Sequence, residues 1–272
     1  MMKRLAVESG SARLVCSVEG TGSSIVLLHA GVADRRSWAD VQHILAPTYR
    51  TIAYDRRGFG ETRYDPETFS HLSDAAAVVQ HLGVDHAVLV GNSMGGALAI
   101  DFALEHSGTV RALVLIASAV SGAPPLNVDT DQESSIEAAL IAADAAGDLD
   151  EVNRLEAWLW LDGGGQPEGR VGDPERTLFL DMNRIALNAP DPGTELDTLE
   201  AFDRLPGLGI PVLLLVGDLD ITYSREMTRI LAERLPRSRS LTVPGSAHLP
   251  QLERPELVAG LIADFVSSVD EV

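Results

Sequence analysis

The sequence predicts an α/β protein in which helices cover both faces of a mostly parallel sheet. Short apolar runs the length of a strand alternate with helix-like segments through the first half of the chain, and the alternation resumes near the end. The length of 272 residues and the hydrophobic content of 45% are enough for one sizeable core. We therefore expect one main domain with a single insertion.

The elements follow from hydrophobic periodicity in chain order. Strands are expected over residues 14–18, 25–29, 51–54, 87–90, 113–117, 211–217 and 240–243. Helices are expected over residues 36–45, 72–82, 97–105, 224–235 and 255–266. Ser9-Gly10-Ser11 predicts the turn of an N-terminal hairpin, and Pro255 suits the first turn of the last helix.

Residues 122–206 differ in character from the rest of the chain. Glycine, proline and acidic residues separate helix-like pieces there, and no strand pattern is present. We interpret this stretch as a helical cap inserted into a core domain of residues 1–121 and 207–272. Its helices are expected over residues 133–146, 149–161, 174–187 and 194–202. The apolar spacing of Leu155, Trp158 and Leu159 indicates a buried face and argues against a disordered insertion.

Composition excludes several function classes. The formal net charge of −19 would repel phosphate backbones and anionic lipid, so we expect neither a nucleic-acid nor a membrane partner. Apolar runs are shorter than the roughly 18 residues that a membrane span needs. The N-terminal segment does not resemble a signal peptide, and we expect a cytoplasmic protein. Its oligomeric state is expected to be a monomer or homodimer.

Single residues narrow the chemistry further. Cys16 is the only cysteine, which leaves no intrachain disulfide and no cysteine cluster for zinc. Lys3 is the only lysine, so an internal Schiff base and a phosphate-loop lysine are both absent. We expect the protein to use no cofactor and no metal.

The strongest motif is the pentapeptide Gly91-Asn92-Ser93-Met94-Gly95. It lies between a buried strand and a helix, where a serine takes a strained backbone conformation that exposes its hydroxyl. Flanking glycines remove Cβ atoms that would collide in so tight a turn. The Met94 amide, at the start of the helix, can donate to a developing oxyanion. The pattern predicts that Ser93 is a nucleophile.

A serine nucleophile needs a histidine base and a carboxylate that orients it. His248 is the candidate base, because it follows the last strand at the carboxyl edge of the sheet. Asp218 and Asp220 both follow the strand before it, and we favour Asp220 because a position about three residues past the strand can reach across. Asp218 is expected to bind local backbone. His29 is expected to pin the loop that supplies a second oxyanion amide, from Gly31.

The order Ser93, Asp220, His248 resembles that of the α/β-hydrolase fold superfamily. Further motifs are similar to that family: His29-Ala30-Gly31 upstream, Tyr54 to Gly60 as the D-x-R-G-x-G turn, and Leu252 to Pro255 as the L-E-x-P ending. The resemblance covers nearly the whole chain. It implies an eight-stranded, mostly parallel sheet, and it implies that the cap is a lid over the acyl pocket. In the D-x-R-G-x-G turn, Asp55, Arg56 and Arg57 can lock the turn or bind a substrate carboxylate, and we favour the first.

Several chemistries share this scaffold. Serine at the nucleophile position argues against dehalogenases and epoxide hydrolases, which need a carboxylate there. The elbow is similar to those of small carboxylesterases, enol-lactonases and meta-cleavage-product hydrolases. We expect a serine hydrolase that cleaves a carboxylic ester or lactone of a small, partly apolar substrate through an acyl-Ser93 intermediate. A C–C bond hydrolase and a non-catalytic small-molecule receptor are the alternatives.

Overall fold

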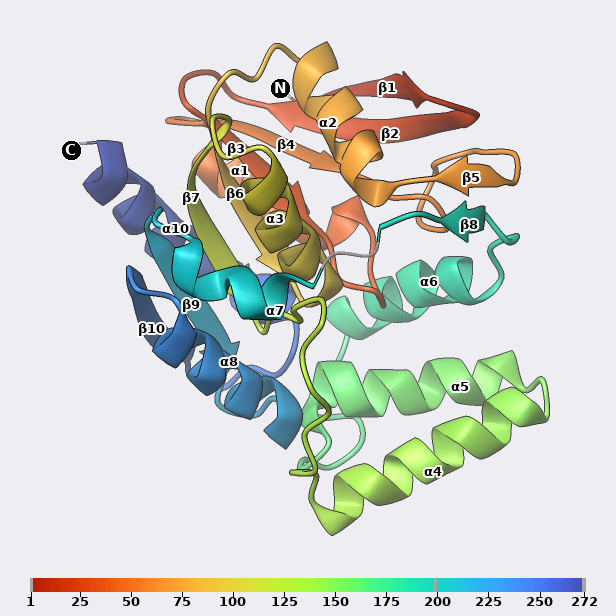
Figure 1. The fold of residues 1–272 in the computed structure, drawn as a ribbon. Coiled ribbons are helices and arrows are strands. Elements are labelled where there is room, and N and C mark those ends of the chain that lie inside the picture. The colour runs from red at the N-terminus through yellow and green to blue at the C-terminus, as the bar shows by residue number, and fades with distance from the viewer. Residues whose placement is uncertain (1, 198–199, 271–272) are drawn as a thin grey trace.

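The computed structural model describes the backbone of residues 2–197 and 200–270. Its centre is the predicted eight-stranded sheet (Figure 1). The strand order is β1-β2-β4-β3-β6-β7-β9-β10; β2 pairs antiparallel with β1 and β4, and every other pair is parallel. The strands are β1 (Lys3–Ser9), β2 (Ala12–Glu19), β3 (Ser24–Leu28), β4 (Arg50–Tyr54), β6 (Ala87–Asn92), β7 (Val110–Ile116), β9 (Val212–Gly217) and β10 (Ser238–Val243). The predicted fold class and the N-terminal hairpin are both confirmed.

Helices cover both faces of the sheet, as predicted. α1 (Ala39–Leu45) and α10 (Pro255–Asp270) pack on one face, where Val41 and Ile262 join the strand side chains in one buried cluster. α2 (His71–His81), α3 (Met94–Glu105) and α8 (Thr222–Arg234) cover the other. A short 3-10 turn (Arg35–Trp38) precedes α1 where the sequence predicts regular α-helix. The buried Asp34 caps this turn, accepting from the Arg36 amide.

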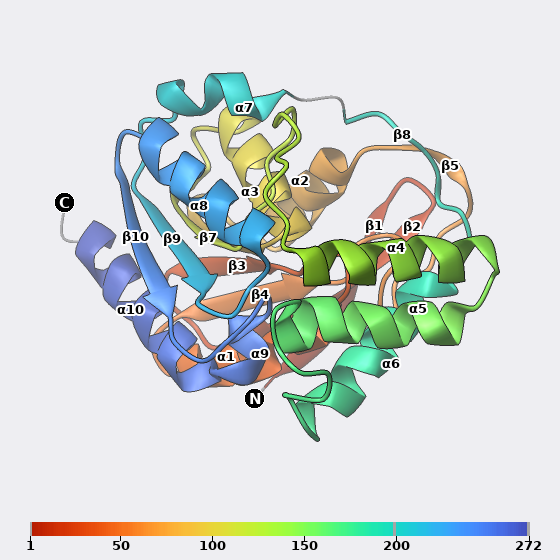
Figure 2. The same cartoon turned by 90° about the horizontal axis from the view of Figure 1, so that it is seen from below.

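The insertion contributes α4 (Asp131–Ala145), α5 (Leu149–Glu156) and α6 (Glu175–Leu187). These three helices gather at one end of the sheet, outside the layers that flank it (Figures 1 and 2). A capping box between Thr130 and Glu133 fixes the start of α4. α5 continues into a π-helix (Ala157–Gly163), where the sequence predicts uninterrupted α-helix to residue 161. Wider turns of this kind are frequent at functional sites.

Two predictions for the insertion are wrong. The helix expected over residues 194–202 is replaced by strand β8 (Gly193–Glu195) and the short helix α7 (Ala201–Arg204), with residues 198–199 outside the described part. β8 pairs in parallel with β5 (Glu67–Phe69), so the insertion does contain a strand. Pairing with a distant segment overrides the weak local pattern here.

Parallel strands bring the ends of β3, β6, β9 and β10 to one edge of the sheet. The segments that directly follow these strands carry Gly31, Ser93, Asp220 and His248, so residues far apart in sequence meet at one place. In the described part of the chain, no helix combines the length and the apolar character needed to cross a membrane.

Candidate active site

Ser93 stands between a strand and a helix with no loop on either side. β6 ends at Asn92 and α3 begins at Met94, while Ser93 takes φ 53° and ψ −117°. This is a left-handed φ that a residue with a Cβ rarely adopts. A Cβ at Gly91 would lie 2.3 Å from the carbonyl oxygen of Gly95, so the turn closes only with glycine there. The strained elbow that the sequence predicts is present.

His248 and Asp220 lie in contact. The Nδ1 atom of His248 is 3.0 Å from Oδ2 and 3.1 Å from Oδ1 of Asp220, whose side chain is fully buried. Oδ1 also accepts the Ile221 amide at 2.8 Å, which fixes the carboxylate. Asp218 instead accepts the Gly245 amide at 2.6 Å, the local backbone role expected of it. The structure therefore brings Asp220, and not Asp218, to the histidine.

A second set of buried polar groups holds the backbone of His248. The Asn92 amide donates to the carbonyl oxygens of His248 and Ile116, both at 3.0 Å, and Gln251 donates to the Asn92 side chain at 3.0 Å. Asn92, next to Ser93 in the chain, thereby ties the elbow to the histidine loop. Gln251 is not predicted from the sequence, since nothing local marks a glutamine after a histidine loop as buried.

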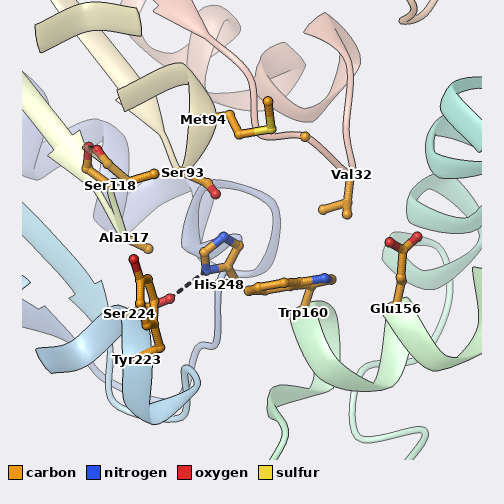
Figure 3. A pocket seen from close by; sticks show the side chains of 12 residues that line it. Val32, Ser93, Met94, Ala117, Ser118, Glu156, Trp160, Tyr223, Ser224 and His248 are labelled. Atoms are coloured by element: carbon orange, nitrogen blue, oxygen red, sulfur yellow. Dashed lines mark hydrogen bonds between the residues drawn. The ribbon is translucent and has the colours of Figure 1, made fainter. Parts of the chain in front are cut away.

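Ser93 and His248 both line one cavity (Figure 3). Its volume is about 360 Å³. Ser224, on α8 (Thr222–Arg234), also lines the cavity, and its hydroxyl oxygen is 3.4 Å from Nδ1 of His248. Ser224 is not predicted from the sequence, because it reaches the site only through the start of α8 beside the loop that carries Asp220.

Gly31 and Met94, whose amides are the expected oxyanion donors, line the cavity beside Ser93. The Met94 side chain lies against the Gly31 backbone, since a Cβ on residue 31 would be 2.6 Å from Sδ of Met94. The carbonyl of Ala30 accepts from His29 Nδ1 at 2.7 Å and from Arg56 at 3.3 Å. Burial beside Arg56 holds the pKa of His29 well below its usual value. His29 is thus a neutral side chain that fastens the loop, as predicted.

Ion pairs to residues on either side of it in the chain hold the D-x-R-G-x-G turn in place. Asp55 accepts the Arg35 amide at 2.9 Å and pairs with the Arg35 side chain, while Arg57 pairs with Asp74 at 2.8 Å. None of the charged residues of the turn lines the cavity that holds Ser93. These contacts support the structural role favoured for the turn over binding of a substrate carboxylate.

Within the described part of residues 122–206, one aromatic residue, Trp160, reaches the site. The Trp160 ring lies 4.6 Å from the His248 ring, and the Trp160 carbonyl accepts the His248 amide at 3.2 Å. Of the other aromatics that could line a pocket, Trp38 and Phe179 are buried in the core. Trp158 donates to the Gln166 carbonyl at 2.8 Å and does not line the cavity.

Three residues past Trp160, a Cβ on Gly163 would stand 2.2 Å from the Leu219 carbonyl. The π-helix is therefore packed against both His248 and the loop that carries Asp220.

In residues 2–197 and 200–270, side chains of histidine, cysteine, aspartate and glutamate form no cluster of three or more that could hold a metal ion.

Comparison with known proteins agrees with this geometry. Residues 25–261 match the model of the alpha/beta hydrolase family. A pimeloyl-[acyl-carrier protein] methyl ester esterase of Photorhabdus laumondii is 28% identical, covering 89% of this chain and 92% of the relative. The solved esterase RhEst1 of Rhodococcus sp. ECU1013 has a TM-score of 0.77 and 27% identity, covering 98% of this chain and 99% of its own. A thermophilic esterase from Thermogutta terrifontis shares the fold, with a TM-score of 0.77 at 24% identity and 99% of both chains covered. The chain belongs to the alpha/beta hydrolase family.

Proposed function

We propose that the protein is a serine hydrolase that cleaves a carboxylic ester or lactone of a small, partly apolar molecule. The observation that carries the proposal is the His248–Asp220 contact of 3.0 Å, beside a strained Ser93 in one cavity. The esterases among the relatives and solved structures agree with it. Residues 122–206 act as the cap that closes this cavity, because Trp160 and Glu156 from that segment line it.

In the proposed reaction, the Ser93 hydroxyl attacks the ester carbonyl carbon while Nε2 of His248 takes its proton. The Gly31 and Met94 amides donate to the oxyanion. The C–O bond to the alcohol then breaks, His248 returns the proton to the leaving oxygen, and an acyl-Ser93 remains. Water, deprotonated by His248, cleaves the acyl group as the free acid. Asp220 keeps the proton of the neutral imidazole on Nδ1 and stabilises the imidazolium.

Hydrolysis of short p-nitrophenyl esters, together with a simple lactone, tests the proposal. Wild-type protein should turn over and be labelled at Ser93 by a fluorophosphonate, and Ser93→Ala should lose at least about three orders of magnitude in kcat. Full activity in Ser93→Ala, or labelling elsewhere, would contradict the acyl-Ser93 mechanism. Binding without turnover would favour a receptor instead.

A further inference from the structure

The wall of the cavity carries one acidic side chain that the proposed reaction does not use. Glu156, the last residue of α5, lines the cavity on the far side of Val32 and Trp160 from Ser93 (Figure 3). The other lining residues are apolar, hydroxyl-bearing or His248, and among the described residues no arginine or lysine lines the cavity. Any group of the substrate that reaches this end therefore meets a carboxyl.

Buried amides hold this carboxyl in place. The Asn183 side chain donates to Oε2 of Glu156 at 2.5 Å and to Oδ1 of Asn153 at 3.0 Å. Asn153 in turn donates to the Leu180 carbonyl at 3.0 Å. Both asparagines are 2% exposed, so they cannot move aside without leaving buried polar groups unpaired. Such support from a second layer of residues is how binding groups are preorganised.

Among the described residues, none donates a hydrogen bond to the second oxygen of Glu156. In the described part of the chain, no side chain or backbone amide bonds to Oε1, and no cation pairs with the carboxyl. Burial raises the pKa of Glu156, and the neighbouring Asp144 carboxylate adds to the effect. A partly buried carboxyl without a cation is costly in the empty site, and a positively charged ligand group would remove that cost.

We propose that Glu156 recognises the remote end of the substrate and selects esters that carry a protonated amine there over neutral or anionic esters. This inference rests on the proposed ester hydrolysis at Ser93 and names its substrate class. The ammonium group would donate to Oε1, while Val32 and the Trp160 ring would contact the apolar chain between the amine and the ester. A carboxylate at the same position would face Glu156 with no cation to compensate.

Matched esters test this selectivity. Ethyl esters of straight-chain acids of increasing length are prepared with a terminal ammonium, methyl or carboxylate group, and a second series carries the same groups on the alcohol. In one series, kcat/KM for the ammonium ester should exceed that for its methyl counterpart by about tenfold or more, the range of a charged hydrogen bond. The carboxylate ester should be the poorest substrate.

Glu156→Gln keeps an oxygen for Asn183 and removes the charge, so the ammonium-to-methyl ratio of kcat/KM should fall toward one. Glu151→Gln is the matched control, since Glu151 lies on the same helix, pairs with Arg154 and does not line the cavity. It should leave the ratio unchanged. A ratio near one in wild type, or an unchanged ratio in Glu156→Gln, overturns the inference while neutral ester hydrolysis still supports the proposed function.

Calorimetric titration separates the two ideas if no ester is turned over. Ser93→Ala protein is titrated with the ammonium and methyl esters, with and without Glu156→Gln. Tighter binding of the ammonium ester that requires Glu156 supports the recognition site even where hydrolysis fails. Equal affinity for the two esters contradicts it.

Discussion

Replacing Asp220 by asparagine tests the proposed machinery most directly. In the proposed mechanism His248 becomes an imidazolium during acylation, and the carboxylate that would stabilise it lies 3.0 Å from Nδ1 with its side chain fully buried. With an effective dielectric constant of about 20, the attraction at this distance is about 5.5 kcal/mol. At about 1.4 kcal/mol per tenfold change, Asp220→Asn should lower kcat/KM for a p-nitrophenyl ester by about 10³–10⁴-fold.

Asp218→Asn supplies the control within the same loop. Asp218 accepts the Gly245 amide and does not contact His248, so its loss should cost less than about tenfold in kcat/KM. Both variants retain a side-chain oxygen for the backbone amide, and circular dichroism should show both folded. Equal losses in the two variants, or a loss below tenfold in Asp220→Asn, would refute the reasoning.

Three further results are expected. Gly163→Ala should lower the melting temperature and kcat, because residue 163 has a left-handed φ and its Cβ would lie 2.2 Å from the Leu219 carbonyl oxygen. Gly165→Ala is the control: its Cβ would meet open space, so this variant should match wild type in thermal melts and ester assays. Gln251→Leu should reduce the free energy of unfolding in urea by about 1–3 kcal/mol, because the buried Asn92 oxygen loses its donor; an unchanged value would contradict this. Burial raises the pKa of Asp101 to about 6, above its value in the unfolded chain, so the folded state holds this proton more tightly and the contribution of Asp101 to stability rises as pH falls from about 7 to 4. Asp101→Asn should remove up to about 1.4 kcal/mol per pH unit of that rise in urea titrations, and an identical pH dependence in the variant would refute the assignment.

Local signals were enough to predict most of the core. Strands buried on both faces are continuous apolar runs, and a parallel sheet necessarily gathers the loops after its strands at one edge. For that reason the pentapeptide around Ser93 and the position of His248 after the last strand were enough to place both residues in one site. Asp220 could be preferred to Asp218 because the reach of the loop distinguishes them.

What could not be predicted depends on tertiary contacts of the insertion. Trp160 and Glu156 look like ordinary residues of an amphipathic helix, and only the packing of α5 and the π-helix brings them to the wall of the cavity that Ser93 also lines. The pairing of β8 with β5 joins segments more than a hundred residues apart, and neither has a strong strand pattern of its own. Ser224 and Gln251 are polar side chains whose partners are likewise distant in sequence.

The anchoring of the π-helix bears on how new specificities can arise on this scaffold. The Trp160 carbonyl holds the His248 amide, and Gly163 fits closely against Leu219 beside the acid. An insertion transplanted from a relative would therefore replace one support of the base and one of the acid along with the substrate pocket. Chimeras that carry a foreign insertion should have a lower turnover number as well as a changed substrate preference. Retaining residues 157–164 of this chain at the junction should restore the turnover number while the transplanted helices still set the substrate.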